Sequence, residues 1–340
     1  MKKSLILFLV ALSFTAAQDK SDYSPKIFGY VRAWHQTDFS TNQGAFLVKM
    51  ARLGAKGDVN EYAGYKILVD FTRLGKLSTS STTIDGTKVL TGASANFSDV
   101  LLDAEAIVKP VKGLSFSLGQ FKVPFSTDNL RSGTDIDFVN RPLLTKVAPG
   151  LRDIGFMGTY AVKNGVPLQF NAGLFNGSGQ NKTEDDKAVN YSLRASVIPV
   201  SGLSLAANYY GGQASGADLG IFDFGFDYKM GNAFFSGEFG QRNTKAATKE
   251  TTANSYFVYA TYEFNFKDSF VSGIVPALRY ENYDPNTDLS DNEIGRITAG
   301  VALQFAKIKF AQFRINYELF DYKDGRENPN QLIIELQTKF

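Results

Sequence analysis

Aromatic side chains alternate without a break with polar or small ones in Phe222-Asp223-Phe224-Gly225-Phe226-Asp227-Tyr228-Lys229. Successive side chains of a β-strand point to opposite faces, so the rings would share one face and the carboxylates the other. The same period of two returns along the chain, at residues 65–71, 100–109, 313–319 and 332–340. The pattern therefore predicts an all-β protein whose strands have one apolar and one charged face.

Two architectures are compatible with this local alternation. In a soluble β-sandwich the rings are buried between two sheets, and the polar faces meet water. In a transmembrane β-barrel the rings face lipid, and the polar faces line a wet lumen. Asp103 and Glu105, a like-signed pair on one charged column, favour the barrel, as does a chain that ends at Phe340 on an apolar column. A periplasmic or secreted sandwich is the alternative.

Composition excludes several classes of protein. The 340-residue chain contains 36 Lys and Arg against 34 Asp and Glu. Nucleic-acid binding is not expected, because it needs a basic excess that displaces counterions from phosphates. The chain has no Cys, which excludes disulfides, thiolate nucleophiles and cysteine metal sites. No cofactor and no bound metal are expected. Aromatic residues make up 14% of the chain although its mean hydropathy is only −0.15, which disfavours a helical membrane protein.

Residues 1–17 are predicted to be a secretory signal peptide. A basic start, Met1-Lys2-Lys3, precedes a Leu-rich apolar run, and Thr15-Ala16-Ala17 supplies small residues for cleavage. Cleavage would remove two lysines and leave 34 basic residues against 34 acidic ones. Residues 18–340 are then expected to form a single outer-membrane domain.

The alternating runs amount to about sixteen strands, a number typical of barrels that enclose a water-filled channel. Tight turns, such as 112–113 and 201–202, alternate with longer polar connections at residues 74–96, 176–188, 244–253 and 284–292. This rhythm is typical of outer-membrane barrels, which have short periplasmic turns and long external loops. Lys49 interrupts the apolar column of its strand, which either a β-bulge or a position at the level of the lipid headgroups would explain.

Several short motifs occur in a recognisable order. The densest is Leu118-Gly119-Gln120-Phe121-Lys122-Val123-Pro124-Phe125-Ser126, followed by Phe138-Val139-Asn140-Arg141-Pro142 and Leu151-Arg152-Asp153-Ile154-Gly155. In these motifs the chain resembles the phosphate-selective porin O/P family of outer-membrane channels. The resemblance implies a transmembrane antiparallel β-barrel of sixteen strands, usually a homotrimer, whose third loop folds inward as a constriction. Some members of that family select phosphate through a ladder of lumen arginines and lysines.

Residues 126–150 correspond to the constriction loop. The segment contains Phe138, Leu143 and Leu144, too much apolar surface to stay in water, so we expect it to pack against the inner wall of the barrel. Its charged residues and their flanks are the predicted constriction: basic Lys122, Arg131, Arg141, Lys146 and Arg152 against acidic Asp128, Asp135, Asp137 and Asp153. This small basic excess favours a weakly anion-preferring or general pore over a tight phosphate trap.

Further lumen-lining candidates lie on the charged columns of the strands. They are Arg52, Lys56, Arg194, Lys229, Arg279, Arg296 and Arg314, offset by Asp103, Glu105, Asp223, Asp227 and Glu238. The mixture of signs departs from an arginine-dominated ladder. The predicted function is therefore passive diffusion of small polar or anionic solutes, with phosphate as one candidate.

Two other functions are left open. External loops rich in Tyr and Asn could plug the barrel, which would then serve as a structural or adhesive envelope protein. An outer-membrane enzyme would need His35, the only histidine, as its base, but no Gly-X-Ser-X-Gly elbow accompanies it. An aromatic-belt or loop-edge position explains His35 better. The protein is therefore not expected to be an enzyme.

Acidic loops are the remaining feature of note. Residues 284–290 have the alternate acidic spacing of a calcium loop, but Leu289 and Gly295 stand where that loop needs Gly and a bidentate Glu. They are interpreted as a solvated loop. The expected partners are outer-membrane lipid, lipopolysaccharide, which the acidic tip at 184–186 could bridge through divalent ions, and small ions or solutes.

Overall fold

The computed structural model describes residues 23–74, 77–84, 87–95, 97–183, 188–267, 269–305 and 311–340. The predicted signal peptide, residues 1–17, and the acidic tip at 184–186 lie outside the described residues. Among the residues described, no helix is long and apolar enough to cross a membrane.

The described chain is almost entirely β-structure. Its strands are β1 (Lys26–Asp38), β2 (Gln43–Asn60), β3 (Ala63–Asp70), β4 (Leu77–Ile84), β5 (Thr87–Ala95), β6 (Leu101–Val111), β7 (Leu114–Lys122), β8 (Arg152–Val162), β9 (Leu168–Phe175), β10 (Asn190–Val200), β11 (Leu203–Ala214), β12 (Ala217–Met230), β13 (Ala233–Ala246), β14 (Lys249–Tyr262), β15 (Phe264–Asn265), β16 (Val271–Asp284), β17 (Ile294–Phe305), β18 (Ala311–Tyr322) and β19 (Gln331–Lys339). The short helical turns are η1 (Phe71–Arg73), η2 (Phe97–Val100), α1 (Thr127–Leu130) and η3 (Leu143–Lys146).

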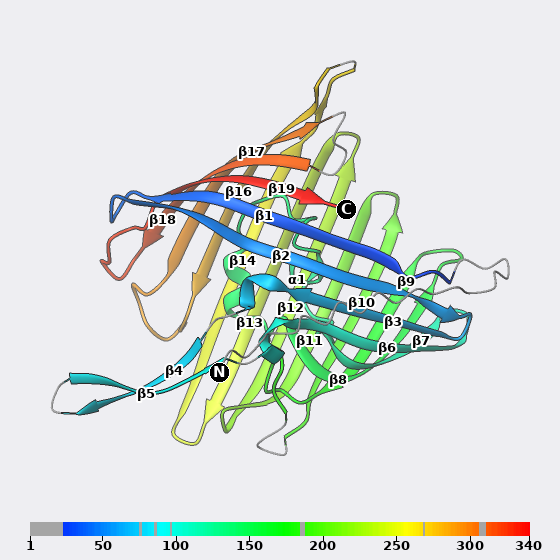
Figure 1. Cartoon of the computed structure of the whole chain (residues 1–340), viewed down its shortest axis with the longest axis horizontal. Helices are drawn as coiled ribbons and strands as arrows, with labels where there is room; N and C mark the ends of the chain where they lie inside the picture. Colours follow the sequence, from blue (N-terminus) through cyan, green and yellow to red (C-terminus); the bar gives the residue numbers. More distant parts are fainter. Residues whose placement is uncertain are drawn as a thin grey trace, which may run out of the picture.

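Seventeen of these strands form one antiparallel sheet that closes into a barrel (Figure 1). The ring closes at β1, where Tyr30 pairs with Arg52 of β2 on one side and with Lys339 of β19 on the other. The two-residue β15 extends β14 along β16, so the wall has sixteen strands, which confirms the prediction. A separate two-stranded sheet, β4 and β5, projects from the barrel wall.

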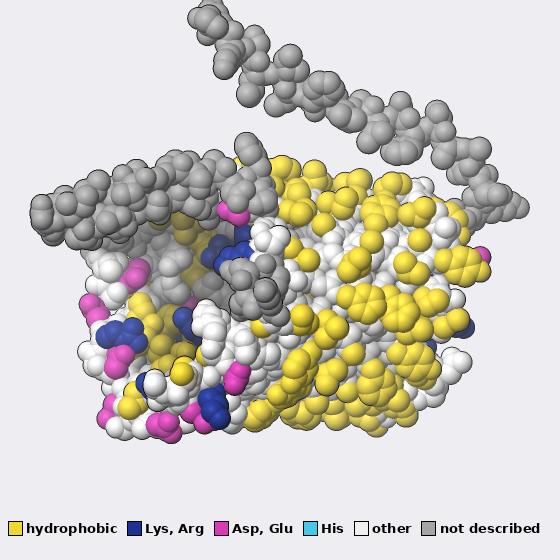
Figure 2. Space-filling model, turned by 90° about the horizontal axis from the view of Figure 1, so that it is seen from below, with side chains coloured by type: hydrophobic (Ala, Val, Ile, Leu, Met, Phe, Trp, Pro, Cys, Tyr) yellow, Lys and Arg dark blue, Asp and Glu magenta, His cyan; other side chains and the backbone are white. Residues whose placement is uncertain are grey.

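Aromatic side chains face outward and charged ones face inward, which excludes the sandwich. In β12, Phe224 is 51% exposed whereas its neighbour Asp223 is 2% exposed. Figure 2 shows hydrophobic side chains covering the outer wall, with Lys, Arg, Asp and Glu gathered around the open end of the barrel. In a bilayer the exposed rings meet hydrocarbon, which stabilises the inserted barrel.

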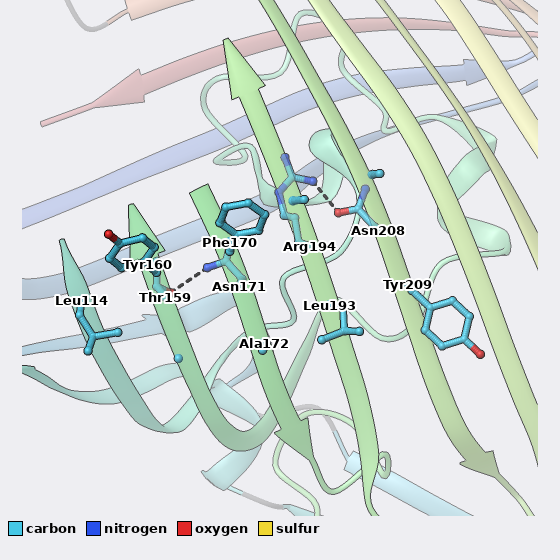
Figure 3. A pocket seen from close by; sticks show the side chains of 13 residues that line it. Leu114, Thr159, Tyr160, Phe170, Asn171, Ala172, Leu193, Arg194, Asn208 and Tyr209 are labelled. Atoms are coloured by element: carbon cyan, nitrogen blue, oxygen red, sulfur yellow. Dashed lines mark hydrogen bonds between the residues drawn. The ribbon is translucent and has the colours of Figure 1, made fainter. Parts of the chain in front are cut away.

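An apolar hollow of about 610 Å³ on the outer face of β8–β11 shows the same division of side chains (Figure 3). Its walls include Tyr160 and Leu193, both about half exposed. The next residue in the chain, Arg194, instead donates a hydrogen bond to Asn208 on the inner face (2.7 Å). Neighbouring residues of one strand thus meet lipid and lumen respectively.

Two of the predicted connections differ from the observed ones. Residues 244–253 were expected to be a long loop, but Ala246 pairs with Lys249 across a two-residue turn at 247–248. The prediction was wrong because β13 and β14 are polar near this turn, and polar composition alone does not distinguish a strand end from a loop. Within residues 74–96, the chain forms the β4–β5 hairpin.

Lys49 lies at a β-bulge, as the broken apolar column suggested. Arg32 of β1 pairs with Met50 while Ala33 pairs with Val48, so Lys49 has no residue opposite it in the ladder. Its ammonium lies 4.8 Å from the centre of the Trp34 ring, a cation–π contact. The extra residue lets the strand keep a cation off its lipid-facing column.

Candidate functional site

The segment 123–151, which joins β7 to β8, crosses the inside of the barrel. Near its start, Ser192 of β10 donates a hydrogen bond to the carbonyl of Pro124 (3.1 Å). Further along, Gln337 of β19 donates to the carbonyl of Thr134 (3.2 Å). Since β10 and β19 lie far apart in the ring, the segment spans the lumen from one wall to another.

Apolar side chains anchor this segment to the inner wall at two places. Phe138, Leu144 and Val147 pack with Phe257 and Tyr259 of β14 in one buried cluster. A second cluster joins both ends of the segment to β7, β9, β11 and β12 through Val123, Phe125, Ala148, Phe121, Phe175, Tyr210, Leu219 and Ile221. The inner wall thus carries apolar patches that match the loop, which explains why the loop does not extend into water.

A ladder of buried ion pairs covers the inner face of β1 and β16–β19. It consists of Arg32, Arg279, Arg296 and Arg314 with Glu281, Glu318 and Glu335, and is called here the Arg–Glu ladder. Glu335 pairs with both Arg32 (2.5 Å) and Arg314. Glu281 pairs with both Arg279 (2.8 Å) and Arg296 (2.6 Å). Glu335 and Glu281 therefore each fix guanidinium groups from two strands, Glu318 binds Arg296 (3.1 Å), and the remaining N–H groups of the arginines point into the barrel.

Those remaining donors bind the main chain of the loop. Arg32 donates to the carbonyl of Val139 (2.7 Å), Arg279 to that of Asn140 (3.1 Å) and Arg296 to that of Arg141 (2.7 Å). Arg314 donates to the carbonyls of Ile136 and Phe138, and Glu281 accepts from the amide of Leu143. The Arg–Glu ladder is thus a socket for residues 136–143 of the loop.

This socket changes the interpretation of three predicted lumen residues. Arg279, Arg296 and Arg314 face inward, but they are only 2%, 6% and 1% exposed because the loop covers them. Alternation in the sequence indicates which face a side chain occupies, but not what covers that face. Arg32, Glu281, Glu318 and Glu335 were not among the candidates, although the period of two places each on a charged column.

Arg131 and Arg141, two basic side chains of the predicted constriction, form ion pairs within the protein. Arg131 pairs with Asp227 of β12 (2.5 Å) and with Asp137 (3.4 Å). Arg141 pairs with Asp128 (2.8 Å). These pairs hold the loop to itself and to the wall.

Lys122 and Arg152 flank the loop. The ammonium of Lys122 donates to the carbonyls of Asn129 (2.8 Å), Leu130 (3.1 Å) and Arg131 (2.6 Å), at the end of α1. Arg152 pairs with Asp103 of β6 (2.6 Å). Both cations lie at the inner wall beside the loop.

Other constriction and lumen candidates are less buried. Lys146 is exposed, and so is Asp135, which pairs with Lys339 of β19 (3.2 Å). Glu105 is partly buried on β6, opposite Lys66 of β3, and Lys229 is exposed near the β12–β13 turn.

A cavity of about 320 Å³ lies between the loop and the wall formed by β1, β2, β3, β6 and β7, and is called here the basic cavity. Its charged lining residues are Arg52, Lys56, Lys66, Lys122, Arg141, Arg152 and Lys339, with Asp103 and Asp135. Arg52, Lys56 and Asp103, three of the predicted lumen candidates, are among these residues. Lys66 was missed, although it stands on the charged column of 65–71 and pairs with Asp103 (2.8 Å).

The basic cavity is adjacent to a second hollow, of about 270 Å³, which shares Lys56 and Lys66 with it. This second hollow also contacts Lys26 and Asp58, near the end of the barrel where the described chain begins. A row of lysines therefore leads from this rim toward the loop.

Two of the acidic candidates, Asp223 and Glu238, lie beneath α1 and are not among the residues that line the basic cavity. Glu238 of β13 accepts hydrogen bonds from the amides of Thr127 (2.6 Å) and Asp128 (3.2 Å). Asp223 accepts from Asn208 (2.5 Å), which in turn accepts from Arg194. Asp223 and Glu238 are both buried. Glu238 therefore binds the start of the loop and does not face the open lumen.

Two other sequence features are also located. His35 lies on the lipid-facing column of β1, with its ring 4.6 Å from that of the exposed Phe46. In the 284–290 turn, Asp284 accepts from the amide of Asn286 (2.9 Å). Within the described ranges, no group of three or more His, Cys, Asp or Glu side chains is placed to hold a metal ion.

Comparisons with known proteins agree with this architecture. The family model for phosphate-selective porin O and P matches residues 32–220, which is more than half of the chain. A search of curated proteins found no match. The solved structure of the outer membrane channel DcaP of Acinetobacter baumannii is similar, with a TM-score of 0.61 and 14% identity over 96% of this chain and 100% of that one.

Two further solved structures are similar in fold. An anion-selective porin from Comamonas acidovorans has a TM-score of 0.63 and 14% identity, covering 93% of this chain and 99% of that one. A loop L8 deletion mutant of OmpT, an outer membrane protein of Vibrio cholerae, has a TM-score of 0.64 and 14% identity with the same coverage.

Proposed function

Because the chain belongs to the phosphate-selective porin O and P family, and is thus an outer-membrane channel for small solutes, we propose that its solutes pass through the basic cavity and that anions are favoured. One observation supports this most strongly. Seven basic side chains and only two acidic ones line the cavity beside the loop. A lining of predominantly one sign raises the local concentration of the opposite ion and selects for it.

Planar bilayer recording of the purified protein tests this proposal. The change is Lys56→Glu, because Lys56 is exposed, lines both hollows and contacts the Phe28 ring at 5.3 Å. We expect the reversal potential in a KCl gradient to move toward the cation side, with the anion-to-cation permeability ratio falling about two- to five-fold. Reversing Arg141 or Arg152 is a poorer test, because each is paired with a buried Asp and reversal would place two carboxylates together away from water.

Lys323→Glu is the matched control. Lys323 lies just beyond β18, and a hydrogen bond to Asp321 raises the pKa of its ammonium, so it carries a full charge at neutral pH. It is not among the residues that line the basic cavity, and its reversal should leave selectivity nearly unchanged. Equal shifts in both variants, or no shift in Lys56→Glu, would contradict the proposed pathway.

A barrel plugged by its loop, acting as a structural or adhesive envelope protein, is the second candidate. It is favoured by the number of contacts that the loop makes with β1, β10, β13, β14 and β16–β19. Absence of conductance steps from a correctly folded protein would support the plugged barrel over the channel.

We also propose that the protein is a homotrimer and not an enzyme. One of the similar solved structures is a trimer form of OmpT from Vibrio cholerae, and the outward apolar hollow on β8–β11 is suited to a lipid or protein neighbour. Chemical cross-linking in native membranes should give a trimer band. Lipid and lipopolysaccharide are the expected surroundings of the aromatic outer wall.

A further inference from the structure

The basic cavity has charge, but its best hydrogen-bond donors are already in use. Arg52 donates to Asp70 (2.8 Å) and to the hydroxyl of Tyr30 (2.7 Å). Arg141 donates to Asp128 (2.8 Å) and to the carbonyl of Arg131 (2.8 Å). Tight phosphate recognition depends on several converging charged donors, often in bidentate geometry. These guanidinium groups already bind acceptors within the protein. The cavity therefore attracts anions through its positive charge and not through donors arranged to fit phosphate.

Apolar groups make up the rest of the lining. Phe28 and Tyr30 from β1, Met50 from β2, Leu68 from β3, and Leu130 and Leu151 from the loop all face the cavity. An inorganic anion gains nothing from such walls, because its whole surface is polar and hydrated. An anion with a hydrocarbon body would bury apolar surface there while its charge stays in the positive field.

Charge and apolar surface lie side by side at two points. The ammonium of Lys56 lies 5.3 Å from the centre of the Phe28 ring, and the guanidinium of Arg52 lies 5.5 Å from that of Tyr30. Lys56 is exposed, so its charge is accessible to a solute. A carboxylate beside Lys56 would bring an attached ring or short alkyl chain against Phe28. Beside Arg52 the corresponding apolar walls are Tyr30 and Met50, which lie together next to Gly133.

From this arrangement we propose that the basic cavity is a binding site for small organic carboxylates with an apolar body, which it holds in preference to inorganic phosphate. The cavity volume of about 320 Å³ is within the range of pockets that hold small organic molecules. The proposal rests on the proposed function, since it names the class of anion that uses the same pathway. Binding must stay weak enough for release, so we expect transient occupancy during passage.

The test measures block of chloride current through single channels in planar bilayers, with benzoate and with phosphate as probes at equal ionic strength. We expect benzoate to reduce the chloride current in a saturable way at concentrations where phosphate has little effect. Met50→Ser should weaken the benzoate block by about five-fold, because it removes apolar contact from the wall while keeping the charges. Lys56→Gln should weaken block by both anions.

Met230→Ser is the control, because Met230 is exposed at the β12–β13 turn and distant from the cavity lining. If Met50→Ser does not fold, Leu130→Ser removes apolar surface from the loop side of the same cavity. Stronger block by phosphate than by benzoate, or a benzoate block unchanged in both serine variants, would overturn the proposal and leave anion selectivity intact. A channel without anion preference would instead refute the proposed function.

Discussion

Glu335 is the residue on which the Arg–Glu ladder depends most. Its carboxylate is fully buried and is shared by Arg32 and Arg314, and both arginines also hold the loop main chain. Glu335→Gln keeps the shape of the side chain but removes the charge that compensates two buried guanidinium groups. Loss of one partner from a buried ion pair is strongly destabilising. We expect the free energy of unfolding to fall by about 3–5 kcal/mol.

Trp34 provides the measurement for this variant. It is the only tryptophan, it is buried, and it contacts Val139 of the loop and Ile333 of β19, so its fluorescence reports on the loop socket. In a denaturant titration followed by Trp34 fluorescence, Glu335→Gln should unfold at a lower denaturant concentration than the parent protein. Glu250→Gln, at the exposed β13–β14 turn, is the control and should unfold like the parent protein. Equal stability of all three would show that the ladder does not support the loop.

At the scale of elements, the strands and the direction of their faces could be predicted from the sequence, but the segments that cover those faces could not. Alternation placed Phe224 outside and Asp223 inside, because a lipid-facing strand must keep its charges on the other face. The same reasoning could not show that Arg279 lies under the loop, since contacts between distant segments leave no local pattern. Gly119 is a similar case: a β-carbon there would lie 2.1 Å from the carbonyl oxygen of Ala104, a restriction visible only in the folded barrel.

The loop itself should behave as a fixed part of the wall. Val139 packs with Trp34 and Ile333, and the chain has no native cysteine, so Val139→Cys with Ile333→Cys would give a single defined cross-link. If the socket holds the loop permanently, oxidation of this pair should leave single-channel conductance and selectivity unchanged. The measurement is conductance before and after reduction in the same bilayer. A rise in conductance on reduction would show that the loop moves, and the loop would then be a gate.

For the whole molecule, selectivity must arise from the distribution of charge, not from its total. The sequence has 36 basic and 34 acidic residues, and nearly balanced charge produces no strong overall field. The structure separates the signs instead: basic side chains line the cavity, whereas Asp223 and Glu238 are buried beneath α1. A local field of this kind acts over short distances and is weakened by mobile ions.

The anion preference should therefore depend on salt. At about 0.1 M the screening length is about 10 Å, comparable with the reach of the lining lysines into the pathway, whereas at about 1 M it is about 3 Å. We expect the anion-to-cation permeability ratio to be largest in dilute KCl and to approach unity in concentrated KCl, as measured by reversal potentials in gradients of fixed ratio. Lys56→Glu should flatten this dependence, while Lys323→Glu should preserve it. A permeability ratio that stayed constant from dilute to concentrated salt would mean that selectivity comes from tight binding at fixed donors, which is the mechanism expected of a true phosphate site.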